Sequence, residues 1–62
     1  MKDVIQLSAA DVNDKYSRYE LSTYRKGISN EFEAMAIVKS RGKGESIIFI
    51  EEKKCYAIVR EL

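Results

Sequence analysis

Two short apolar runs near the C-terminal end constrain the fold of this 62-residue chain more than any other feature. Residues 46–50 and 55–59 are both rich in β-branched and aromatic side chains, and each run has the length of one strand. The charged residues 51–54 separate the two runs, and four residues are an ordinary length for an antiparallel connection. The pattern therefore predicts a β-hairpin over residues 46–59.

Residues 29–41 carry the start and stop signals of a helix. Asn30 stands three positions before Glu33, which is the spacing of a capping box. Acidic side chains occupy the first turn and basic side chains the last turn, and Gly42 follows at the position of a C-terminal cap. The alternative is a strand, because residues 31–38 also alternate in polarity. We predict a helix because the order of charges and the terminal glycine favour it.

The N-terminal half has weaker patterns. Residues 2–7 and 18–25 show the alternation of short strands, and we expect one strand in each. Between them, residues 8–11 have side chains that cap a short helical turn ending near residues 13–14. A longer helix that runs through Tyr19 is the alternative.

Together these elements predict an α+β fold with the chain order β-β-α-β-β, in which one helix covers one face of a small antiparallel sheet. Residues 1–62 are expected to form a single domain, since no linker or internal repeat divides them. Both faces of the hairpin are apolar, however, and one helix covers only one of them. A chain of this length buries only about 60% of its unfolded surface, so the second face also needs a cover.

We expect a second copy of the chain to cover that face. Two-fold homodimers are the commonest oligomers, and they let small domains share a core. The alternative is that the N-terminal segment folds over the face within one chain. Alternation along the two strands predicts a dimer face of four residues: Ile47, Phe49, Ala57 and Val59.

The composition leaves few groups for catalysis or metal binding. The chain has no histidine and one cysteine, so the usual zinc and haem ligands are missing, as is the commonest general base near neutral pH. The close carboxylate pairs diverge on their predicted elements. We therefore expect no enzymatic activity, no metal and no cofactor. For Cys55, a small buried hydrophobic role is favoured over a reactive thiol or a contact with its symmetry mate.

The expected compartment is the cytoplasm. A single cysteine cannot form an intramolecular disulfide, which favours a reducing environment. The longest apolar runs are far shorter than the roughly 20 residues of a membrane-spanning helix. The first residues also lack the pattern of a signal peptide. We therefore expect neither a membrane-spanning segment nor a signal peptide.

The strongest candidate for a binding region is residues 15–26, which interleave three of the four tyrosines with four of the eleven basic residues. Protein interfaces are enriched in tyrosine and arginine. The same composition also suits nucleic acid, where rings stack on bases and cations neutralise phosphates. The predicted partner-binding residues are Tyr16, Arg18, Tyr24, Arg25 and Lys26.

A second basic group ends the predicted helix, and its members are candidate phosphate contacts: Lys39, Arg41 and Lys43. The net charge is only +1, which is not the electrostatic footprint of a polybasic protein. The two glycines among these basic residues do not make a phosphate loop, because here the loop leaves a helix and enters a strand. We therefore expect a non-enzymatic regulatory or inhibitory module that binds a protein, with nucleic-acid binding as the alternative.

Overall fold

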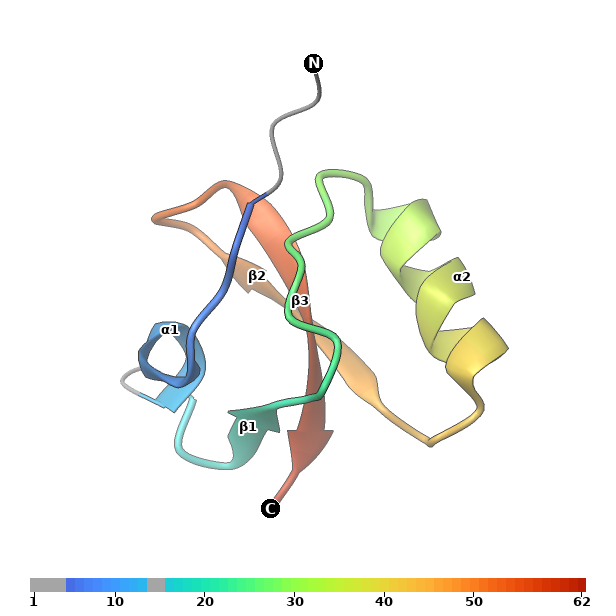
Figure 1. Cartoon of the computed structure of the whole chain (residues 1–62), viewed down its shortest axis with the longest axis horizontal. Coiled ribbons are helices and arrows are strands. Elements are labelled where there is room, and N and C mark those ends of the chain that lie inside the picture. The colour runs from blue at the N-terminus through green and yellow to red at the C-terminus, as the bar shows by residue number, and fades with distance from the viewer. Residues whose placement is uncertain (1–4, 14–15) are drawn as a thin grey trace.

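The computed structural model describes residues 5–13 and 16–62, and this part of the chain forms two helices and three strands. In chain order they are α1 (Ala9–Asn13), β1 (Tyr19–Leu21), α2 (Glu31–Arg41), β2 (Ser46–Ile50) and β3 (Cys55–Glu61). The strands pair antiparallel in the order β1-β3-β2, so that β3 lies in the middle of the sheet (Figure 1). The predicted α+β class is confirmed, with two helices in place of one.

The C-terminal hairpin lies where the sequence predicted it. β2 and β3 pair in continuous register from Ser46 opposite Val59 to Ile50 opposite Cys55, and residues 51–54 form the turn. Local composition was sufficient to predict the hairpin, because both strands are rich in β-branched residues and the polar turn is short.

Helix α2 begins and ends at the predicted caps. The Asn30 side chain accepts a hydrogen bond from the Glu33 N–H at 3.1 Å, which satisfies one of the free donors of the first turn. At the other end Gly42 adopts a left-handed conformation with φ of 62° and donates its N–H to the Val38 carbonyl. Glycine adopts this conformation without the steric penalty of a Cβ atom.

The N-terminal half departs from the prediction. Residues 2–4 of the first expected strand lie outside the described residues, and Gln6 makes a single bridge to Lys26. The second expected strand is reduced to β1, because the Ser22 hydroxyl accepts the Tyr24 N–H at 3.1 Å and so forms a local turn beyond it. The observed chain order is therefore α-β-α-β-β and not β-β-α-β-β.

Helix α1 is the short helical turn expected after residue 8. Its Asp11 carboxylate accepts the Ser8 N–H at 2.7 Å. Lys53 Nζ lies 3.6 Å from the same carboxylate and donates to the Gln6 carbonyl at 3.0 Å. These contacts join the start of the chain to the β2–β3 turn. The longer helix does not form, because Tyr19 begins β1.

Each face of the sheet has its own core, and α1 and α2 lie on opposite sides of the sheet (Figure 1). The α1-side core contains the buried residues Leu7, Val12, Leu21, Ile50, Cys55, Ala57 and Val59. The α2-side core contains the buried residues Ile28, Ala34 and Ile58, with Tyr24, Ile37, Val38, Ile47 and Tyr56 packed around them.

The four residues of the expected dimer face do not share a face. The register pairs even-numbered residues of one strand with odd-numbered residues of the other, and cross-strand partners point to the same side. Ile47 and Phe49 therefore face α2, whereas Ala57 and Val59 lie in the α1-side core and are both 0% exposed. The N-terminal segment and α1 cover the second apolar face within one chain. The length of the turn sets this register, and alternation along either strand alone does not reveal it.

Candidate functional site

The two tyrosines among the five residues predicted to bind a partner lie on opposite faces of the sheet. Tyr16 packs against the α1-side core, and its hydroxyl donates a hydrogen bond to the Phe49 carbonyl at 3.1 Å. Tyr24 packs against the α2-side core on the opposite face. The three basic members are exposed: Arg18, Arg25 and Lys26. The structure thus does not bring the five side chains onto one surface, and the two tyrosine rings are engaged by the cores.

Arg41 is engaged by neighbouring groups of its own chain. Its guanidinium donates to the Glu45 carboxylate at 2.6 Å and 3.2 Å and to the Thr23 hydroxyl at 2.8 Å. It also lies 5.6 Å from the centroid of the Tyr24 ring. The hydrogen bonds between the two side chains raise the pKa of Arg41 and lower the pKa of Glu45. The remaining candidate phosphate contacts are exposed: Lys39 and Lys43.

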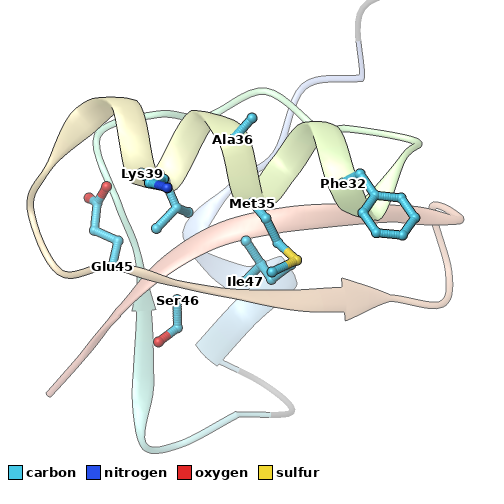
Figure 2. A pocket seen from close by; sticks show the side chains of 8 residues that line it. Phe32, Met35, Ala36, Lys39, Glu45, Ser46 and Ile47 are labelled. Carbon is cyan, nitrogen blue, oxygen red and sulfur yellow. The ribbon is translucent and has the colours of Figure 1, made fainter.

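A groove of about 580 Å³ runs between α2 and β2 (Figure 2). The residues that line this α2–β2 groove are Phe32, Met35, Ala36, Val38, Lys39, Glu45, Ser46 and Ile47. Phe32 is 80% exposed and Met35 is 54% exposed. Neighbouring apolar side chains with this much exposure mark an interaction surface on a folded domain.

Helix α2 exposes these side chains because its sequence carries two stripes at helical spacing. The first stripe packs on the sheet: Ala34, Ile37 and Val38. The second stripe follows the spacing i, i+3, i+4 and i+7 along the side of the helix that borders the groove: Phe32, Met35, Ala36 and Lys39. The sequence-based prediction did not include Phe32 or Met35, although this second stripe is visible in their spacing.

The outer edge of β2 lies beside the groove. Tyr56 of β3 exchanges both backbone hydrogen bonds with Ile28, at 2.9 Å and 2.6 Å, so its N–H and C=O point away from β2. Its cross-strand partner Phe49 therefore directs its own backbone groups outward, and antiparallel alternation directs those of Ile47 outward as well. The Tyr16 hydroxyl already binds the Phe49 carbonyl. The Ile47 N–H and C=O thus point outward beside the groove, the orientation needed to pair with an added strand.

The two ends of the groove carry opposite charges. Residues 42–45 reverse the chain between α2 and β2, so the start of the helix lies beside the end of the strand. Figure 2 shows Phe32 and Lys39 at opposite ends of the groove. The exposed basic residues at one end are Lys39 and Lys43, and the exposed acidic residues at the other end are Glu31 and Glu51.

The other candidate groups lie apart from this groove. Cys55 is 0% exposed, and its burial raises the pKa of the thiol. Within residues 5–13 and 16–62, no group of three or more carboxylate, thiol or imidazole side chains is placed to hold a metal ion. In the same residues, neither helix has the length and apolar character needed to cross a membrane.

No family model matches this chain, and comparisons with curated proteins and with solved structures also find no similar protein. Its function is therefore inferred from the groove, the strand edge and the charges around them.

Proposed function

We propose that this chain is a non-enzymatic regulatory or inhibitory module that acts by binding a protein partner, and that the α2–β2 groove receives an extended segment of that partner. One observation carries the proposal: Phe32 and Met35 are 80% and 54% exposed beside the outward-facing backbone of Ile47. Apolar anchors and backbone hydrogen-bonding groups occur together at this edge of the sheet.

Strand addition is the binding mode that uses both features. A segment paired with β2 exchanges main-chain hydrogen bonds with Ile47 and so gains affinity without regard to its sequence. Every second side chain of that segment points to the α2 side of the sheet and enters the groove. There it meets Phe32 and Met35, which act as the apolar anchors. The groove volume of about 580 Å³ lies within the range of small binding sites.

The surroundings support a protein partner over nucleic acid. The groove wall is mostly apolar, and Tyr16 and Tyr24 are packed against the cores rather than free to stack on bases. Arg41 also has its charge neutralised by Glu45. An apolar groove beside outward-facing backbone groups of an edge strand favours an extended polypeptide with apolar residues at alternate positions.

Selection from a displayed library of short unstructured peptides tests this proposal, with the chain held dilute. We expect the selected peptides to share apolar residues at alternate positions and to shift the NMR amide signals of residues 46–48. Met35→Glu places a charge in the groove and should abolish capture. Ser40→Glu places the same charge on an exposed position of α2 that does not line the groove, and it should leave capture unchanged. Peptides that bind both variants equally would overturn the proposal.

Nucleic-acid binding is measured with the same chain and a random single-stranded oligonucleotide. Phosphate contacts would make the affinity fall steeply between about 50 and 200 mM salt. They would also make it depend on Arg25 and Lys26, whose replacement by alanine leaves the groove intact. Salt-sensitive binding that is lost in this double variant, with no peptide selected, would replace the proposed function with the nucleic-acid alternative.

A further inference from the structure

We infer that the segment that fills the α2–β2 groove is β2 of a second copy of this chain, so that two chains form an antiparallel two-fold dimer through β2 and α2. This inference rests on the proposed function, because it names the partner of the same groove. It differs from the dimer expected from the sequence, whose face included Ala57 and Val59 of the α1-side core.

The sequence of β2 gives its edge little protection. Edge strands are usually blunted by charged side chains, proline or a bulge, and Ser-Ile-Ile-Phe-Ile contains neither a charge nor a proline. The Tyr16 hydroxyl covers only the Phe49 carbonyl, at the far end of the strand. Pairing of β2 with its own copy closes this edge and joins two three-stranded sheets into one.

The charges around the groove select the antiparallel orientation. A two-fold axis perpendicular to the sheet brings the basic end of one groove against the acidic end of the other. Lys39 and Lys43 of one copy then face Glu31 of the second copy. Parallel pairing through the same edge would turn one copy over and place the two helices on opposite faces of the sheet, so that these charges would not meet. The chain is thus complementary to itself in one orientation only.

The exposed side chains of α2 have the size needed to fill the seam between the two copies. Each helix contacts both β2 and β3, so it lies over that pair of strands. Two such helices on one continuous sheet would lie about two strand spacings apart, or roughly 10 Å. This is the distance between helices in direct contact, which is about 8–10 Å. Phe32 and Met35 of both copies would pack against each other at that contact, with the small Ala36 near the helix midpoint.

Sedimentation velocity of the full chain between about 1 µM and 500 µM tests the dimer. We expect the mass to rise with concentration from one chain to two. Met35→Glu should raise the dissociation constant at least about tenfold. Ser40→Glu, the matched control on α2, should change it by less than about twofold. A chain that stays monomeric throughout, or a dimer that both variants weaken equally, would overturn the inference.

Charge reversal tests the orientation. Glu31→Lys and Lys39→Glu should each weaken the dimer, because each sets like charges together across the seam. The double variant restores opposite charges in an antiparallel dimer and should recover most of the lost affinity. Melting curves of each variant confirm that the fold is intact. A double variant that associates no better than the single variants would overturn the antiparallel arrangement.

The two proposals fail in different ways. Peptide capture in the groove of a chain that remains monomeric would overturn the dimer and leave the proposed function standing. A dimer that Met35→Glu breaks, with no peptide captured by the dilute chain, would support the dimer and overturn the binding of a foreign segment.

Discussion

Gly27 lies directly against the side chain of Cys55. A Cβ atom at position 27 would come within 2.6 Å of Cys55 Sγ and 3.0 Å of Ile5 Cγ2. A glycine is therefore required at position 27 because a side chain would not fit. Gly42 and Gly44 serve a different purpose, since they adopt positive φ angles of 62° and 67°. The sequence alone does not separate these two uses of glycine, since all three residues are typical of turns and loops.

Gly27→Ala should lower the free energy of unfolding by about 1–3 kcal/mol, because the added methyl group overpacks the α1-side core. The backbone has little room to retreat, since the Gly27 N–H donates to the Ile5 carbonyl at 2.8 Å. Urea denaturation measures the loss. Cys55→Ala removes the sulfur, so the double variant should lose less than the sum of the two single variants. Strict additivity would mean that the contact with sulfur is not the cause.

The Cys55 thiol should react slowly in the folded chain. It is 0% exposed, and burial raises its pKa, so neither access nor thiolate character favours alkylation. We expect iodoacetamide at pH 8 to modify the native protein at least about 100-fold more slowly than the urea-unfolded protein. Mass spectrometry at timed intervals gives both rates. Comparable rates would contradict the burial of this side chain under Gly27.

The elements that the sequence predicts correctly are those with local causes. The hairpin over residues 46–59 follows from two strand-forming runs around a short polar turn, and α2 follows from Asn30, Glu33 and Gly42. In each case the residues that determine the structure are within a few positions of one another.

The features that the sequence does not predict depend on contacts between distant residues. Leu7 and Val12 cover the second face of the sheet. From the sequence, this cover is only the alternative to a dimer, because alternation within the hairpin does not identify which segment covers a face. The pairing of Ile50 with Cys55 decides which hairpin residues share a face, and it separates the residues of the expected dimer face. The helical spacing of Phe32 and Met35 can be recognised in the sequence, but their exposure depends on how α2 packs on the sheet.

The N-terminal cap of α2 should contribute measurably to stability. Asn30→Ala removes the acceptor of the Glu33 N–H and should lower the free energy of unfolding by about 1 kcal/mol. Asn30→Asp keeps an acceptor at the same place and adds a negative charge at the positive end of the helix dipole, so it should preserve stability. Thermal melts by circular dichroism compare the three chains. An equal loss in both variants would show that this hydrogen bond does not stabilise the helix.

Acid should destabilise the fold in part through Glu45. The Arg41 guanidinium, through its hydrogen bonds, lowers the pKa of Glu45 below its ordinary value of 4.5. A carboxyl whose folded pKa is lowered stabilises the fold above its unfolded pKa, and this contribution is lost as the pH falls through the folded pKa. The free energy of unfolding should therefore decline below about pH 4.5, and Glu45→Gln should make that decline shallower. Urea titrations at several pH values measure the free energy of unfolding, with Glu31→Gln as the control on an exposed carboxyl. If the free energy of unfolding of Glu45→Gln declined at low pH as steeply as that of the unchanged chain, the ion pair would not couple folding to pH.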